Sequence, residues 1–156
     1  MSIHIGDVSV HYSGSEESVL HGIGLDIEPG TVTLICGASG SGKSSVLRLI
    51  NGLIPHFHTV ESTGTVTVDG HNVAETEVHQ MGTLTATVFQ NPRTQFFTTD
   101  VDSELAFAGE NYQLPPDTIR ARSAEALEYV GISDLAGLNL WGLSGGQLQK
   151  VACAQA

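Results

Sequence analysis

One stretch constrains this chain more than any other: residues 37–44 read GASGSGKS and match the phosphate-binding pattern Gly-x-x-x-x-Gly-Lys-Ser/Thr. An apolar segment, residues 31–36, precedes the stretch, and apolar residues at helical spacing follow it over residues 46–53. Because glycine has no Cβ, the loop can curl until its N–H groups point inward, beside the positive end of the following helix. The pattern therefore predicts an anion site, in which Lys43 reaches the β- and γ-phosphates and the Ser44 hydroxyl ligates Mg²⁺.

Length and charge limit the size of the domain and the kinds of partner that this chain can have. The chain has 156 residues, enough for one modest domain with a real core. Its 17 acidic residues outnumber 6 basic ones, and the net charge of −11 fits poorly with nucleic acid or an anionic membrane surface. It does not exclude a partner that is itself a membrane protein. The two cysteines form no spacing motif, so we expect reduced thiols in the cytosol, with Cys36 as a small core residue.

Hydrophobic periodicity predicts an alternation of strands and helices. Strands are predicted over five segments, residues 3–12, 19–27, 31–36, 64–70 and 84–89, of which 31–36 is apolar enough to be central. A polar loop is predicted over residues 13–18 and a short helix within residues 71–82. The sequence turns helical from Asp100, and the acidic residues Asp100, Asp102 and Glu104 suit a first turn because acids complement the helix dipole. It turns helical again over residues 118–130, with Asp117 as N-cap and Gly131 as the stop.

A second stretch, residues 144–147, predicts another helix start. Ser144 is followed three residues later by Gln147, which is the pattern of a capping box, and a helix is predicted over residues 148–156. Gly145 and Gly146 would leave the first N–H groups of that helix sterically open, as a phosphate requires. A plain helix cap explains the same residues, so the stretch alone leaves both readings open.

The string from Leu143 to Gln147, LSGGQ, resembles the signature motif of the ATP-binding-cassette (ABC) ATPases. The resemblance extends over the whole chain in the right order, with residues 37–44 as the Walker A loop. It implies that Tyr12 stacks on adenine and that Gln90 is the Q-loop glutamine, which touches Mg²⁺ beside Ser44. The residues it assigns to nucleotide are Tyr12, Gly37, Ser39, Gly40, Ser41, Gly42, Lys43, Ser44, Ser45, Gln90, Ser144, Gly145, Gly146 and Gln147.

The resemblance implies an α/β fold, the RecA-like P-loop NTPase core with an N-terminal antiparallel β-subdomain and a helical subdomain. On this scheme residues 1–30 and 64–70 form the β-subdomain, and residues 31–63 and 71–95 form the core. Residues 96–142 form the helical subdomain, and residues 143–156 hold the signature and the helix after it. The cofactors implied are ATP and Mg²⁺.

Within the family, three stretches are similar to the cobalt and energy-coupling-factor vitamin importers: VFQNPRTQ at 88–95, DSELAFAGEN at 102–111 and NGLIPH at 51–56. The similarity implies an ATP-hydrolysing subunit that powers import of a vitamin, a vitamin precursor, or a cobalt or nickel ion. The implied partners are a second ATPase subunit, identical or paralogous, in a head-to-tail pair, and an integral membrane subunit. The chain would then lie at the cytoplasmic face of the membrane.

The sequence departs from the family at its end. It stops at Ala156, before the Walker B aspartate, the catalytic glutamate and the switch histidine, and none of its seven histidines follows the signature. No catalytic residue is therefore assigned, and we expect the N-terminal part of a longer ATPase, inactive in turnover on its own. The alternative is a nucleotide-binding or interaction fragment without hydrolysis. A small nucleotide kinase or GTPase shares the loop but leaves Gln90 and residues 143–147 unexplained.

Aromatic residues at two places in the sequence have competing interpretations, and a third has one. Tyr12 is either an adenine platform or an aromatic at a strand end. The pair at Phe96 and Phe97 is either part of a groove for a membrane partner or local core. Trp141 is expected to pack within the helical subdomain.

Overall fold

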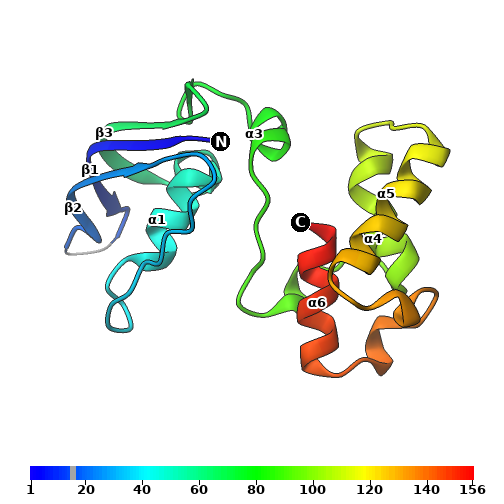
Figure 1. Ribbon diagram of the computed structural model, residues 1–156. Helices are drawn as coiled ribbons and strands as arrows, with labels where there is room; N and C mark the ends of the chain where they lie inside the picture. Colours follow the sequence, from blue (N-terminus) through cyan, green and yellow to red (C-terminus); the bar gives the residue numbers. More distant parts are fainter. Residues whose placement is uncertain (15–16) are drawn as a thin grey trace. The chain divides into compact units, whose positions relative to one another are not determined.

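The computed structural model describes residues 1–14 and 17–156. Residues 15 and 16, which belong to the predicted polar loop, lie outside the described part. The chain divides into two compact units, residues 1–86 and 87–156 (Figure 1). Among the described residues, none of the helices combines the length and the apolar content needed to cross a bilayer.

The first unit is built on a four-stranded antiparallel sheet in the order β2-β1-β3-β4. Its strands are β1 (Ile3–Tyr12), β2 (Leu20–Ile27), β3 (Val60–Val68) and β4 (His71–Asn72). The strands predicted over 3–12, 19–27 and 64–70 are thus present, and β3 begins earlier, at Val60. The apolar side chains of β1 and β3 that face one way form the core, which explains why alternation predicted both strands.

The central strand β1 carries a bulge opposite Gly64. Buried positions in β1 are Ile3 and Ile5, then Val8 and Val10, so the alternation slips by one residue between the two pairs. In β3, Gly64 faces this slip with a φ of 81°, and a Cβ there would lie 2.5 Å from the carbonyl oxygen of Asp7. Only glycine fits that approach, so Gly64 fixes the register that carries β1 on to Tyr12.

Three helices complete this unit: α1 (Lys43–Ile50), α2 (Leu53–His56) and α3 (Val78–Leu84). The predicted helix after the glycine-rich loop and the short helix within 71–82 are both found, the second ending slightly later. Val46 and Leu49 of α1 and Ile54 of α2 are buried in the same core as the apolar residues of the strands. Burial of this stripe anchors α1, and with it the loop that precedes α1, to the sheet.

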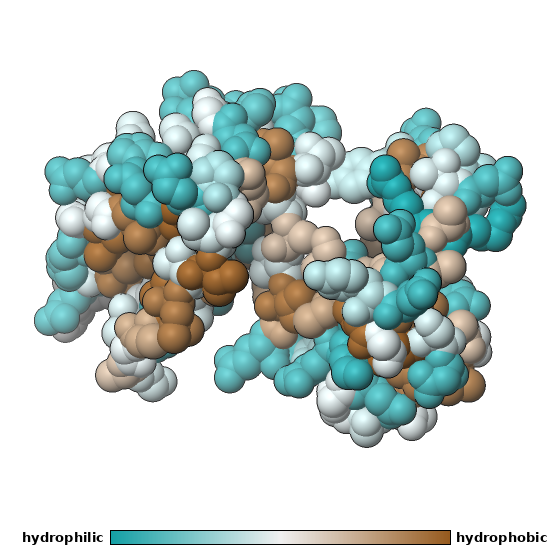
Figure 2. All heavy atoms as spheres, in the orientation of Figure 1, coloured by the Kyte–Doolittle hydropathy of each residue, from teal (hydrophilic) through white to brown (hydrophobic). Residues whose placement is uncertain are grey.

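The strands predicted over residues 31–36 and 84–89 are wrong. Leu84 is the last residue of α3, residues 31–36 and 85–89 are irregular, and in the described chain neither segment pairs with a strand. Val32 and Leu34 are 99% and 83% exposed, and the Cys36 thiol is exposed too, which corrects its expected place in a core. A segment with strand propensity forms a strand only where a neighbouring strand supplies backbone hydrogen bonds. Without such a neighbour, apolar side chains of these segments stay on the surface. Figure 2 shows brown, hydrophobic areas on the surface of the first unit.

The second unit contains three α-helices, α4 (Val101–Asn111), α5 (Pro116–Tyr129) and α6 (Gly145–Gln155). Single turns of 3-10 helix lie before α4, at η1 (Pro92–Thr94), and between α5 and α6, at η2 (Ser133–Leu135) and η3 (Leu140–Gly142). Its core includes Val101, Leu127, Leu148 and Val151, which come from all three helices. The helical prediction for this region is confirmed.

Details of the predicted helix ends differ. Helix α5 begins at Pro116 with Pro115 as N-cap, so Asp117 lies in the first turn and is not the cap. Gly131 follows α5 with a φ of 66°, as the predicted stop requires. Trp141 is 73% exposed and lies under the Arg93 guanidinium, 5.8 Å from the ring centroid, which corrects its predicted place in the packing.

Asp100 caps α4, and its replacement gives a first prediction. The carboxylate accepts from the Ser103 amide and the Ser103 hydroxyl, both at 2.9 Å. The hydrogen bond from the Ser103 amide is the main reason why the pKa of Asp100 lies below its ordinary value of 3.8. Asp100→Ala should lower the free energy of unfolding by about 1 kcal/mol at neutral pH.

The loss from Asp100→Ala should depend on pH. A pKa lowered by folding stabilises the protein above the unfolded value of 3.8, and this contribution fades as pH falls below it. Urea unfolding at about pH 7 and about pH 2.5 measures both limits. Asp102→Ala, which removes an acid from the same turn without a capping bond, is the control. A loss as large at the lower pH would contradict the capping role.

Candidate functional site

The glycine-rich loop ends at the start of α1 with its first N–H groups open. Gly42 is the N-cap, in a left-handed conformation with a φ of 86°. Among the described residues, the amides of Lys43 and Ser44 donate no hydrogen bond. Donors left over at a helix start, together with the helix dipole, attract an anion.

Lys43 arches back over the loop. Its Nζ donates to the carbonyl oxygens of Gly37 at 3.0 Å and Ala38 at 2.6 Å, and to the Ser41 hydroxyl at 3.4 Å. These partners are neutral and exposed, so no carboxylate competes with an incoming anion for the ammonium group. A phosphate oxygen would be a stronger partner than a carbonyl, because the bond is then between opposite charges.

Gly42 could not be another residue here. A Cβ at this position would lie 2.7 Å from the Leu20 side chain and 3.0 Å from the carbonyl oxygen of Val19. The start of β2 therefore lies directly against the loop, and the positive φ adds a second requirement for glycine. This close approach forms one wall of a cavity of about 160 Å³, lined by Val19, Gly40, Ser41, Gly42, Lys43, Ser44 and Ser45.

Tyr12 reaches the same helix from the end of β1. Its hydroxyl lies 3.3 Å from the buried Ser45 hydroxyl and accepts from Arg48 at 3.4 Å, both on α1. Its ring meets the ring of His58 edge to face, with centroids 5.8 Å apart. The structure thus brings Tyr12 close to the glycine-rich loop, as stacking on a nucleotide there would require. Contact with adenine remains a prediction.

The signature segment forms the predicted capping box. The Ser144 amide donates to the Gln147 side chain at 2.9 Å, and the Gln147 amide donates to the Ser144 hydroxyl at 3.4 Å. A Cβ at either Gly145 or Gly146 would meet nothing within 4 Å. Among the described residues, therefore, no packing contact requires glycine at the two positions.

Gln90 lies in the second unit, in an exposed bend before η1. The residue before it is held by a hydrogen bond: the Phe89 amide donates to the Gln95 side chain at 3.0 Å. The glycine-rich loop belongs to the first unit, whereas Gln90 and residues 144–147 belong to the second. The roles of Ser44 and Gln90 toward a metal remain predictions.

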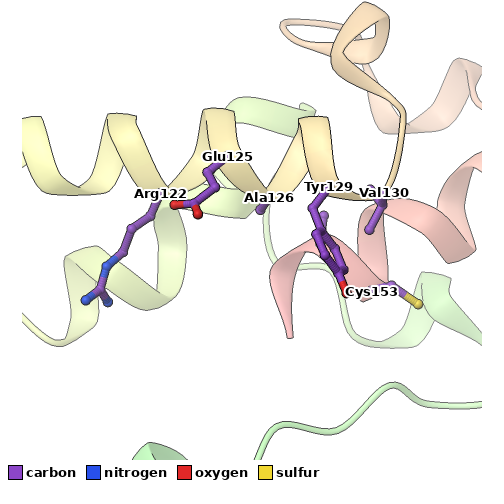
Figure 3. Close-up of a pocket in the computed structure, with 7 residues that line it drawn as sticks. Arg122, Glu125, Ala126, Tyr129, Val130 and Cys153 are labelled. Carbon is purple, nitrogen blue, oxygen red and sulfur yellow. The ribbon is translucent and has the colours of Figure 1, made fainter.

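Two features of the second unit were missed from the sequence. Glu104, expected only to complement a helix dipole, is fully buried and bonded to three other residues. A cavity of about 260 Å³ also lies between α5 and α6, where Figure 3 shows Arg122, Glu125, Tyr129 and Cys153 around it. No predicted site residue lines this cavity, and no sequence motif marked it.

Phe96 and Phe97 differ in their surroundings. Phe96 packs against the core of the second unit, as local core residues do. Phe97 is exposed and stacks on Phe107 of α4, with ring centroids 4.9 Å apart. Phe96 thus follows the local-core interpretation, whereas a place for Phe97 in a groove for a membrane partner stays a prediction.

The residues present fit a polyphosphate with a divalent cation. Open amides, the Lys43 ammonium group and the hydroxyl of Ser44 line one cavity at the start of α1, and the absence of a Cβ on Gly42 lets the start of β2 form its wall. These are the donors that a phosphate chain needs, and the Ser44 hydroxyl is the kind of hard oxygen ligand that Mg²⁺ prefers.

Comparisons with known proteins agree with this geometry. The family profile described as "ABC transporter" matches residues 20–156. An ABC transporter ATP-binding protein of Treponema denticola is 45% identical over 152 residues, which cover 97% of this chain and 31% of the relative. One from Streptomyces coelicolor is 39% identical over 150 residues, covering 96% and 27%.

Among solved structures, cbiO1 from Clostridium perfringens, described as part of the ABC transporter complex cbiONQ, is similar with a TM-score of 0.84. It is 30% identical, and the match covers 98% of this chain and 59% of that one. The chain thus spans only 31% and 27% of the two curated relatives' lengths. The resemblance drawn from residues 37–44 and 143–147 is confirmed, as is the α/β P-loop fold: this chain belongs to the ABC transporter ATP-binding family.

Proposed function

We propose that this chain is the nucleotide-binding part of an ATPase subunit that powers import through a membrane transporter. The observation that carries the proposal is the start of α1, where the amides of Lys43 and Ser44 are open and the Lys43 ammonium group lies on the preceding loop. ATP with Mg²⁺ is the ligand that the family binds and that this donor set fits. When bound, Mg²⁺ neutralises charge on the phosphates.

The residues of this chain would divide the work of binding. Lys43 supplies a fixed positive charge to the β- and γ-phosphates, and the Ser44 hydroxyl holds the metal ion. Gln90 would approach the same ion from the second unit. Tyr12, already fixed at α1 by Ser45 and Arg48, would offer its ring face to adenine.

The signature segment would act on the nucleotide of a second subunit. No contact among the described residues requires glycine at Gly145 or Gly146, so the close approach that glycine permits would be to another molecule. A head-to-tail pair would bring Ser144 and Gly146 of one subunit to the γ-phosphate held by the other. The second subunit is either identical or a paralogue.

The transported substrate is proposed to be a vitamin, a vitamin precursor, or a cobalt or nickel ion. Support comes from residues 51–56, 88–95 and 102–111, and from the likeness to cbiO1, which belongs to the complex cbiONQ. The subunit would then lie at the cytoplasmic face of the membrane, held there by an integral membrane subunit that recognises the substrate.

Gly146→Ala tests the proposal because it should lower the rate of ATP hydrolysis without lowering the stability of the fold. Alanine favours a helix over glycine by up to about 1 kcal/mol, and a Cβ at Gly146 meets nothing in this chain, so the free energy of unfolding should stay level or rise. At the same time, a methyl group between two subunits should lower the kcat of ATP hydrolysis by the intact protein about tenfold.

Gly142→Ala is the matched control for Gly146→Ala. Gly142 also has open space around its Cβ position and lies just before the signature, outside the predicted contacts. Its replacement should leave kcat within about twofold. If Gly146→Ala kept wild-type kcat at saturating ATP, the proposed role of the signature toward a second subunit would be wrong.

A further inference from the structure

Glu104 is the one buried charged side chain in the described part of the chain, with 0% exposure. Its Oε2 accepts from the Phe97 amide at 3.0 Å, the Thr98 amide at 2.8 Å and the Thr98 hydroxyl at 2.7 Å. Its Oε1 accepts from Gln155 Nε2 at 2.7 Å. Both oxygens therefore face hydrogen-bond donors, as a buried acidic side chain requires.

The bonds continue beyond Gln155. Its Oε1 accepts from Gln95 Nε2 at 3.2 Å, and Gln95 Oε1 accepts from the Phe89 amide at 3.0 Å. Three side chains thus link α4, the last turn of α6, and the backbone next to Gln90. All of these residues belong to the second unit.

The acid at one end sets the direction of every bond. Because Glu104 Oε1 accepts, Gln155 must turn its NH₂ toward it and its oxygen toward Gln95. Gln95 must then offer its own NH₂ to Gln155, which leaves its oxygen for Phe89. An amide that flipped would set two acceptors or two donors against each other, and this would break the chain of bonds.

From this arrangement we propose that Glu104, Gln155 and Gln95 form a positioning relay, which holds the backbone beside Gln90 in a fixed place relative to α6. Ser144 of the signature is the N-cap of α6. The relay therefore links the segment that carries Gln90 to the helix that follows the signature serine. None of the three side chains is assigned to nucleotide; they act through Phe89 and α6. That the relay matters for hydrolysis rests on the proposed function.

An exchange of donor and acceptor tests the relay. Gln155→Glu sets a second carboxylate against Glu104 and removes the donor, so the Phe89 amide should lose its ordered acceptor and exchange with solvent about tenfold faster. The double variant Glu104→Gln with Gln155→Glu rebuilds the bonds: residue 104 now donates, and residue 155 accepts from it and from Gln95. Phe89 exchange should return to within about threefold of wild type.

Amide hydrogen exchange of Phe89 is measured without nucleotide on the intact protein, and kcat and the Kd for MgATP are measured on the same samples. Gln155→Glu should lower kcat about tenfold and leave the Kd unchanged, and the double variant should recover kcat. Gln149→Glu, which adds the same charge at an exposed position of α6, should change neither exchange nor kcat.

Gln95→Leu is a second test in case Gln155→Glu fails to fold. It breaks the relay at its partly exposed end without adding a charge. It should also speed Phe89 exchange. Unchanged Phe89 exchange in both single variants would overturn the relay, as would a double variant no better than Gln155→Glu. A wild-type protein that neither binds nor hydrolyses ATP would defeat the proposed function, and the exchange data would still decide the relay.

Discussion

Lys43→Ala should lower the affinity for MgATP about a hundredfold. Lys43 provides the one cationic side chain among the residues that line the cavity at the start of α1 in the described structure. A charge-assisted bond to a phosphate is worth about 2–3 kcal/mol, which corresponds to this loss. Because Lys43 bonds only to exposed carbonyl and hydroxyl groups of its own loop, its removal should leave the unfolding temperature nearly unchanged.

Calorimetric titration with MgATP measures the affinity, and Lys150→Ala is the matched control. Lys150 is the only other lysine of the sequence and is exposed on α6, outside the predicted contacts. Its replacement should change the affinity of the Walker A site by less than about twofold. Equal affinities for wild type and Lys43→Ala would mean that ATP does not bind at residues 37–44.

Gly64→Ala should have the largest effect on folding. An added Cβ would lie 2.5 Å from the carbonyl oxygens of Gly6 and Asp7, which are backbone atoms of the central strand and cannot move aside cheaply. The positive φ of 81° adds strain for any other residue. We expect a loss of about 3 kcal/mol or more in the free energy of unfolding, since the bulge and the register of β1 must change.

Gly70→Ala separates the two causes of that loss. Gly70 follows the same strand with a φ of 79°, but a Cβ there meets nothing within 4 Å. Its replacement should therefore cost only the backbone strain, about 1 kcal/mol. Urea unfolding of both variants gives the comparison, and equal losses would show that Gly64 is not held by the bulge.

Local patterns were sufficient where the interaction itself is local. The capping box at Ser144 and Gln147 and the glycine-rich loop before α1 depend on residues a few positions apart, so the sequence predicts them directly. The stop at Gly131 belongs to the same class. Even the slipped alternation of β1 is visible in the sequence, although its partner Gly64 is not.

Predictions from sequence patterns were wrong where strand formation or burial depends on contacts with residues far away in the sequence. Residues 31–36 and 84–89 have the composition of strands but no neighbour in the described chain to pair with. Cys36 and Trp141 were expected inside because of their type, and both are exposed. Glu104 shows the opposite error, since an acid in a first helical turn usually faces water and this one is buried among donors 6 to 51 residues away.

The central claim is that ATP binds with its phosphates at the start of α1. Titration of ¹⁵N-labelled protein with MgATP, followed by amide chemical shifts, tests it most directly, because the amides of Lys43 and Ser44 should themselves become hydrogen-bond donors to phosphate. The account predicts large, saturable shifts at Gly42, Lys43 and Ser44, absent in Lys43→Ala at the same ATP concentration. Saturable shifts elsewhere, with these three amides unmoved, would contradict it.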